Sequence, residues 1–264
     1  MKAPVVATET ECSEVIAGSG DTIQDGQMAS VELSIYNGTT GTLIQQSDYD
    51  GTNLQNLVMS DKMLTGLRKG LSCGREGSRV VIVIPPADGF GANGNSQWNV
   101  SGTDSLVLVI DVKQVFLAKA NGTPQLSQDG MPMVVLAPNG QPGITVPSTD
   151  APSNQRISVL KKGNGATIKS GQTVTVHYEA ALWSDGKVFD SSWADGSPVQ
   201  LLVGDGVKDQ GKVIQGFSNA VIGQNVGSQI LTVIPPSLAY GNTASTLVPA
   251  GSTLVFVIDI LGVS

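Results

Sequence analysis

The apolar positions of this chain fall into short runs that glycines, prolines and polar turns separate, the pattern of a protein built mainly from strands. Ile214, Phe217 and Val221 share helical spacing and predict a short helix with one apolar face. The β-branched run 230–234 predicts a strand, which the proline pair 235–236 must end because proline has no N–H to donate to a ladder. A helix this short is stable only when packed, so we expect it to lie against a sheet.

The second half of the chain contains the other parts of a small antiparallel sheet. Residues 174–178 alternate between apolar and polar side chains, as a half-buried strand does. The segment 184–187, with the sequence Ser-Asp-Gly-Lys, predicts a hairpin turn into a return strand at 188–192. A polar loop at 204–211 precedes the helix, and the Val- and Ile-rich run 254–261 predicts a central closing strand. Strands combined with one short helix indicate the α+β class.

An internal repeat doubles this architecture. The segment that begins at Met63 aligns without a gap with the one that begins at Val213, as far as the proline pair of each. Further along, Ser105–Val112 matches Thr253–Ile260. Matches in this order indicate the duplication of one domain of about 100 residues, rather than a solenoid, which needs three or more repeats.

The repeat divides the chain into four parts: an N-terminal extension (1–13), a first copy of the domain (14–117), a connector (118–155) and a second copy (156–264). The connector is rich in Pro, Gly, Ser and Asn, but two apolar runs, 133–137 and 143–147, flank a turn signal. This pattern predicts an extended or hairpin-like segment, with a possible strand pair, packed on one domain. Disorder is the alternative that its composition leaves open.

Charge and cysteine content narrow the classes of function. The net charge of -7, with no Lys/Arg cluster, argues against a nucleic acid partner. No apolar run reaches the ~18–20 residues of a transmembrane helix. The single histidine and the two cysteines, Cys12 and Cys73, match no metal spacing, so we expect no metal site. The cysteines form one disulfide if the protein is exported, or remain two buried thiols if it is cytosolic.

Four motifs of the second copy occur together, in this order, in a known family. They are VTVHYEAALWSDGKVFDSS, VIQGF, VGSQILTVIPPSLAYG and VPAGSTLVFVIDI. The second copy therefore resembles the FKBP-type peptidyl-prolyl cis-trans isomerases. The resemblance implies two FKBP-like domains, each a twisted antiparallel β-sheet wrapped around one short α-helix. It also implies a prolyl isomerase that assists protein folding, uses no cofactor, and takes proline-containing polypeptides and macrolides of the tacrolimus and rapamycin type.

The two-domain layout with its connector is similar to exported or envelope-associated family members of Gram-positive actinobacteria. This similarity implies an extracellular or cell-envelope location, with a cytoplasmic location as the alternative. We expect the protein to be a monomer. Two other functions stay open at this point: a non-catalytic tandem binding protein or chaperone, and an envelope scaffold.

The same resemblance assigns a site to the second copy. The catalytic residues are Tyr178, Phe189, Asp190 and Tyr240, and the substrate-binding residues are Val213, Ile214, Phe217, Leu247, Val248 and Phe256. By resemblance they line an apolar cleft at the start of the helix. There the Ile214 N–H and the Tyr240 hydroxyl donate to substrate carbonyls, and Asp190 faces the rotating amide. The segment 193–196 stands where the family often has an arginine, so Asp190 lacks that guanidinium partner.

The first copy keeps the framework of the domain but not the polar groups of this site. At the corresponding positions it has Leu33, Ile44, Gln45, Leu67, Phe90 and Leu108. The carboxylate and both tyrosine hydroxyls are therefore absent from it. We expect an inactive structural or protein-binding domain.

Overall fold

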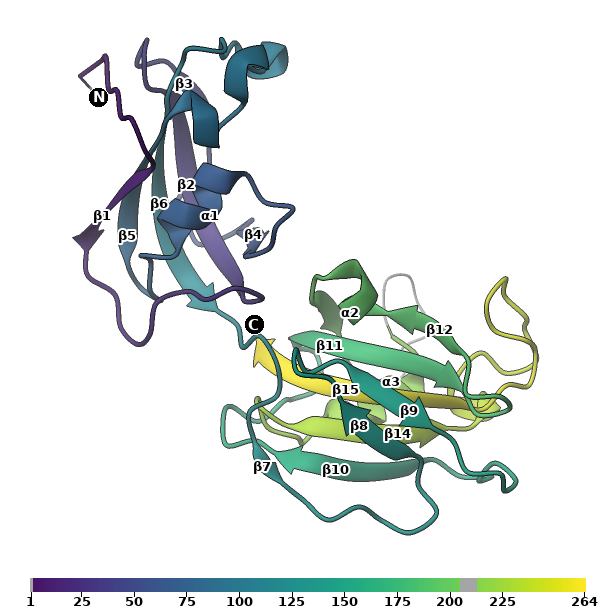
Figure 1. Ribbon diagram of the computed structural model, residues 1–264. Helices are drawn as coiled ribbons and strands as arrows, with labels where there is room; N and C mark the ends of the chain where they lie inside the picture. The colour runs from purple at the N-terminus through teal and green to yellow at the C-terminus, as the bar shows by residue number, and fades with distance from the viewer. Residues whose placement is uncertain (1, 205–212) are drawn as a thin grey trace. The chain divides into compact units, whose positions relative to one another are not determined.

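A computed structural model describes residues 2–204 and 213–264 of the chain (Figure 1). The chain divides into two units, Met1–Ala118 and Lys119–Ser264. Most of the polar loop expected at 204–211 lies outside the described residues. Within the described ranges, no helix is long and apolar enough to cross a membrane.

The first unit has a six-stranded antiparallel sheet. Its elements are β1 (Glu11–Ile16), β2 (Met28–Asn37), β3 (Leu43–Gln46), β4 (Gln55–Val58), α1 (Thr65–Leu71), β5 (Arg79–Ile84), the 3₁₀ turns η1 (Pro86–Asp88), η2 (Gly91–Asn93) and η3 (Ser96–Trp98), and β6 (Leu106–Val115). The strand order is β1-β5-β6-β2-β3, and β4 also pairs with β2. Helix α1 packs on β5, where its buried residues join the core.

The second unit has a seven-stranded antiparallel sheet and a separate hairpin. Its elements are β7 (Thr123–Pro124), β8 (Met133–Leu136), β9 (Pro142–Thr145), β10 (Arg156–Lys162), β11 (Thr173–Leu182), β12 (Val188–Ser191), α2 (Ser192–Asp195), β13 (Val199–Leu202), α3 (Gln215–Val221), β14 (Gln229–Ile234), η4 (Pro236–Leu238) and β15 (Leu254–Val263). The strand order is β12-β11-β15-β14-β10-β7, β13 also pairs with β11, and β8 pairs with β9.

The two sheets repeat each other strand for strand. In the second unit β10, β14, β15, β11 and β12 take the places of β1, β5, β6, β2 and β3. The two sheets also share a β-bulge, which lies between Glu14 and Ile16 in β1 and between Val159 and Lys161 in β10. The predicted fold class is therefore confirmed. The one-turn helix α2 is an addition that the hydrophobic pattern did not reveal.

A glycine lets each helix approach its sheet. A Cβ atom on Gly216 of α3 would lie 2.3 Å from Cγ2 of Ile234, and one on Gly66 of α1 would lie 2.2 Å from Cγ2 of Ile84. These distances are far below van der Waals contact, so a side chain could fit only if the helix moved away from the sheet. The close approach explains in physical terms why both copies have a glycine at this position.

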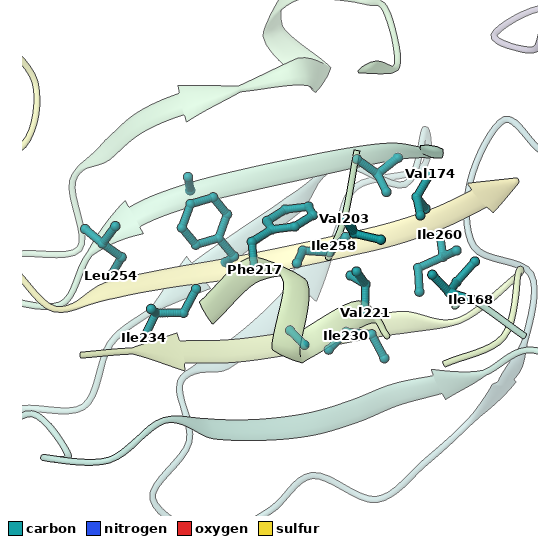
Figure 2. Packing of buried hydrophobic residues seen from close by; sticks show 14 of the residues in the cluster. Ile168, Val174, Val203, Phe217, Val221, Ile230, Ile234, Leu254, Ile258 and Ile260 are labelled. Atoms are coloured by element: carbon teal, nitrogen blue, oxygen red, sulfur yellow. The ribbon is translucent and has the colours of Figure 1, made fainter. Parts of the chain in front are cut away.

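The core of the second unit lies between α3 and one face of its sheet. Figure 2 shows Phe217 and Val221 of α3 among Ile230 and Ile234 of β14 and Ile258 of β15. All five side chains are buried. Burial of each such side chain contributes about 1.5–3 kcal/mol, so this packing stabilises a helix that is too short to persist alone.

The first domain begins earlier than the sequence predicted. Strand β1 starts at Glu11 and corresponds to β10, which starts at Arg156. Further upstream, the Val5 N–H donates to the carbonyl of Gly38 at 2.9 Å. The segment predicted as an extension, 1–13, thus contains part of the sheet. The sequence did not indicate this strand, because β1 is exposed along its whole length and therefore shows no alternation of apolar and polar residues.

The segment predicted as a connector, 118–155, lies in the second unit from Lys119 onward. There β7 pairs with β10, and β8 pairs with β9. The apolar side chains of this segment cover the face of the sheet that is opposite to α3, which we call the outer face. Met131, Val134, Ile144 and Val146 pack there with Leu231, Val233, Val255 and Val257.

A disulfide joins Cys12 to Cys73, with a Cα–Cα distance of 6.7 Å. It connects β1 to the residue that follows the C-cap of α1. Of the two states that the sequence left open, the structure contains the bonded one. The bond lies entirely within the first unit, and the second unit has no cysteine.

Candidate active site

Four aromatic side chains of the second unit form one cluster centred on Phe256 of β15. The ring centroid of Phe256 lies 6.0 Å from that of Tyr178, 6.1 Å from that of Phe189 and 5.8 Å from that of Phe217. Phe217 and Phe256 are 2% and 6% exposed, whereas Tyr178 and Phe189 are half-buried. The contacts of Phe189 and Phe217 with Phe256 are edge-to-face, and such contacts stabilise the ring positions beyond simple burial. The cluster therefore has a buried floor and a partly open side.

The sheet register brings a carboxylate to this cluster. Ala180 of β11 pairs with Phe256 on one side and with Asp190 of β12 on the other. Tyr178 is two residues before Ala180, so its side chain leaves the same face of the strand. The Tyr178 hydroxyl donates to Oδ2 of Asp190 at 2.6 Å. This short bond fixes the carboxylate of Asp190, which is exposed, beside the aromatic rings.

The two tyrosines of the site are held in the protonated form. Burial, with the hydrogen bond to Asp190 and its charge adding to it, raises the pKa of Tyr178 well above its ordinary value. Burial raises the pKa of Tyr240 as well, and the charge of Asp190 acts in the same direction. Both side chains therefore keep their O–H at neutral pH. Tyr240 is 47% exposed, so its hydroxyl group is within reach of a bound molecule.

Helix α3 begins beside the same core. Ile214 is its N-cap, has extended backbone angles and makes no side-chain capping bond. Its carbonyl accepts from Phe217 and Ser218, but among the described residues no acceptor pairs with its own N–H. Val213 and Ile214 are half-buried and pack against the aromatic core. The helix start thus offers a backbone donor next to an apolar surface.

Two of the assigned residues in the loop between η4 and β15 differ in burial. Val248 is 4% exposed and belongs to the core, whereas Leu247 is 61% exposed and is not among the described residues that pack on it. Two residues that the sequence reasoning did not assign, Leu238 and Ala239, also pack against this core. Their position just before Tyr240 in the SLAYG motif was the available clue. The structure therefore gathers the assigned residues around one core, except Leu247 and Tyr240. Tyr240 lies close enough to Asp190 to be affected by its charge.

His177 is buried next to the site without being part of it. Its Nδ1 lies 2.9 Å from the hydroxyl of Ser192, and its ring stacks on Trp193 with centroids 4.0 Å apart. Burial lowers the pKa of His177 from 6.5 to about 4. The imidazole is therefore neutral at pH 7, as a structural residue should be.

This burial predicts that the second domain loses stability in mild acid. The unfolded chain binds a proton at His177 near pH 6.5, whereas the folded chain does so only near pH 4. Stability is therefore unaffected above pH 6.5 and falls by about 3 kcal/mol as the pH drops to 4. The imidazole signals of the single histidine, followed by NMR, measure the folded pKa directly. A His177→Phe variant keeps the ring stack and should lose this pH dependence; an unchanged dependence would contradict the assignment.

The corresponding positions of the first unit have the same backbone arrangement with different chemistry. Ile35 of β2 pairs with Gln45, as Ala180 pairs with Asp190 in the second unit. Phe90 takes the place of Tyr240 and contacts the Trp98 ring edge-on at 5.4 Å. Leu33, Ile44, Leu67 and Leu108 complete an apolar core. The first unit thus fills this region with its own side chains.

Within the residues that the structure describes, no three or more His, Cys, Asp or Glu side chains are gathered in a way that could hold a metal ion. The side chains of the site are apolar rings, hydroxyls and one carboxylate. Such a set binds and orients a ligand rather than attacking it.

These features define a duplicated α+β domain whose second copy has an apolar, aromatic candidate site with few polar groups. Residues 20–113 and 165–261 both match the family model described as FKBP-type peptidyl-prolyl cis-trans isomerase. The chain belongs to this family, and it is an enzyme of the prolyl isomerase class.

Sequence relatives agree with this assignment. The FK506-binding protein of Streptomyces anulatus is 35% identical over 125 residues, which span 47% of this chain and 97% of that protein. FK506-binding protein 1A of Neurospora crassa is 37% identical over 122 residues, 46% of this chain and 94% of that protein. Among solved structures, the three FKBP domains of wheat FKBP73 align over 97% of this chain and 94% of that one, with 21% identity and a TM-score of 0.42.

Proposed function

We propose that the second domain catalyses cis-trans rotation of X-Pro bonds in proline-containing polypeptides and so assists their folding. The observation that carries the proposal is the aromatic cluster around Phe256 with the Tyr178–Asp190 hydrogen bond at its edge. The first domain has the same framework without this pair. A contrast of this kind within one chain is expected if one copy keeps a site and the other does not.

The chemistry requires neither a nucleophile nor a cofactor. The barrier to rotation is amide resonance, about 20 kcal/mol. The twisted amide has less charge separation than the planar one, so removal of water disfavours the planar state more. A site with Phe189, Phe217 and Phe256 as walls supplies this apolar surrounding. Catalysis then follows from binding the twisted form more tightly than the planar form.

The polar groups orient the substrate in this proposal. The Ile214 N–H and the Tyr240 hydroxyl donate to two substrate carbonyls, one on each side of the proline. Asp190, fixed by Tyr178 at 2.6 Å, faces the amide that rotates. Val213 and Val248 extend the apolar wall, and Leu247, which is 61% exposed, contacts the flanking substrate residues. The substrate proline ring lies over Phe217.

Further properties follow from the family and from the first unit. Macrolides of the tacrolimus and rapamycin type are proposed to occupy the same cleft, in line with the names of the relatives. The first domain is proposed to be catalytically inactive, and the protein to act as a monomer. The Cys12–Cys73 disulfide supports an extracellular or cell-envelope location, because such bonds persist in oxidising compartments.

The proposal is tested by assaying the two units separately. Residues 119–264 should accelerate isomerisation of a proline tetrapeptide as the full chain does, and tacrolimus should abolish the effect. Residues 1–118 should show no rate above the uncatalysed one. If 119–264 folds but has no activity while it binds unfolded proteins, the rival function of a non-catalytic binding protein replaces this one.

A further inference from the structure

One surface of the domain is covered in the second copy and only partly covered in the first, where Val107 is buried and the Tyr49 hydroxyl donates to the Val109 carbonyl. In the second unit the segment 119–145 lies along β10 and over the outer face of the sheet (Figure 1). In the first unit the equivalent edge strand, β1, is exposed at all six positions. The repeat therefore provides an internal reference for what this surface can bind.

Main-chain and side-chain hydrogen bonds hold the covering segment on β10. Arg156 donates from Nη1 to the carbonyl of Gly130 at 3.2 Å and from Nη2 to that of Asp129 at 2.8 Å. The Gln125 N–H donates to the carbonyl of Leu160 at 2.8 Å, beside the short β7–β10 ladder. The segment is thus attached by an edge-strand pairing and by one cationic side chain.

Apolar contacts complete the cover in the second unit. Leu231, Val233, Val255 and Val257 are at most 1% exposed beneath the covering segment. The paired registers β5–β6 and β14–β15 place Val81, Val83 and Val109 of the first unit at three equivalent positions. These three valines are only half-buried. At the adjacent edge, Val15 and Ile16 are 54% and 51% exposed.

We call this region the β1 surface: Glu11, Val15, Ile16, Val81, Val83 and Val109. Its charge differs from that of the covered copy. Glu11 is opposite Val83, as Arg156 is opposite Val233, so a carboxylate replaces the guanidinium that anchors the covering segment. Among the described residues, no cation forms an ion pair with Glu11. Two cations of the first sheet, Arg79 and Lys113, already form ion pairs with Asp111 and Glu32.

We propose that the β1 surface is a docking site for an extended segment of a partner protein. The segment adds a strand to β1, places alternating apolar side chains beside the exposed Val15 and Ile16, and has a lysine or arginine opposite Glu11. Strand addition supplies main-chain hydrogen bonds, and alternate side chains supply specificity. A second molecule of this chain that pairs through its own β1 fits less well, because β1 contains two glutamates and no lysine or arginine to place opposite Glu11.

Two short synthetic peptides without proline test this proposal on the full chain under non-reducing conditions. One alternates valine with lysine and threonine, and its acidic counterpart has glutamate for lysine. The basic peptide should shift the NMR amide signals of β1 and bind about two- to fivefold more tightly than the acidic one, the effect of one solvent-exposed ion pair. Glu11→Arg should reverse this preference, and Ile16→Ser should weaken both peptides.

A matched control distinguishes binding at the β1 surface from nonspecific binding. Leu126 is 94% exposed and lies outside the β1 surface, so Leu126→Ser should leave binding of both peptides unchanged. The Glu11 and Ile16 variants should retain full prolyl isomerase activity, since both residues belong to the first unit and the proposed site belongs to the second. Equal binding of the two peptides, or shifts that avoid β1, would overturn the proposal. A dimer that Ile16→Ser abolishes would also overturn it, because the occupant would then be a second copy.

Discussion

Replacement of Asp190 by leucine together with Tyr240 by phenylalanine is expected to lower the prolyl isomerase activity of the full chain by about 10- to 100-fold. The change removes the acceptor of the 2.6 Å bond from Tyr178 and the exposed hydroxyl of Tyr240. In the proposed mechanism these groups orient a twisting amide rather than stabilise a full charge. Their loss therefore costs about 1.4–2.7 kcal/mol of barrier, less than the loss of an oxyanion-hole donor costs a protease.

The double variant should remain folded, because Asp190 and Tyr240 are both exposed while the rings beneath them are not. A change of kcat/KM with an unchanged urea midpoint is the expected combination. Gln45→Leu, at the position of Asp190 in the first domain, is the matched control and should leave the rate unchanged. An undiminished rate in the double variant would remove these two residues from the site.

Much of the fold could be predicted because local and long-range patterns agree. The helical spacing of Ile214, Phe217 and Val221, the apolar run before the prolines, and their repetition in the first copy all describe one helix on one sheet. The glycine at 66 and again at 216 has the same cause, a helix in contact with an isoleucine of the neighbouring strand. Repetition made weak patterns reliable, since each copy provides a check on the other.

What could not be predicted depends on contacts that no local pattern describes. Strand β1 is exposed at every position, so it has no apolar alternation to reveal where the first sheet begins. The apolar runs of the connector predicted a strand pair packed on one domain, but they did not indicate which domain or which face of its sheet the pair would cover. Two cysteines far apart in sequence give no sign of their distance in space.

The candidate site, like the fold, could be predicted only in part. Its residues were assigned by resemblance, and the structure supplies their geometry: the β11–β12 register that brings Asp190 to Tyr178, and the exposure of Leu247. Leu238 and Ala239 were not assigned to the site because apolar side chains have no functional group that distinguishes site residues from core residues in a sequence. A site built mainly from apolar surface is therefore recognised by shape more than by composition.

Removal of the Cys12–Cys73 bond is expected to destabilise the first domain by about 4 kcal/mol. The bond closes a loop with a sequence separation of 61, and the chain-entropy relation for a loop of this length gives that figure. The edge strand that it ties down has little other support, because all six residues of β1 are exposed and, in the part of the chain that the structure describes, β1 pairs only with β5. The effect is a large part of the stability of a domain of this size.

The measurement compares urea unfolding of the native protein with that of a Cys12→Ser, Cys73→Ser variant, with hydrogen exchange of β1 and β5 amides reporting on the first domain. The urea midpoint of the first domain should fall by at least about 1.3 M, given slopes of about 1–3 kcal/mol/M for small domains. The second domain is the internal control, since it has no cysteine and its midpoint should not move. A first-domain midpoint that stays in place would show that packing alone holds β1. The β1 surface would then be as well ordered in a reducing compartment as in an oxidising one.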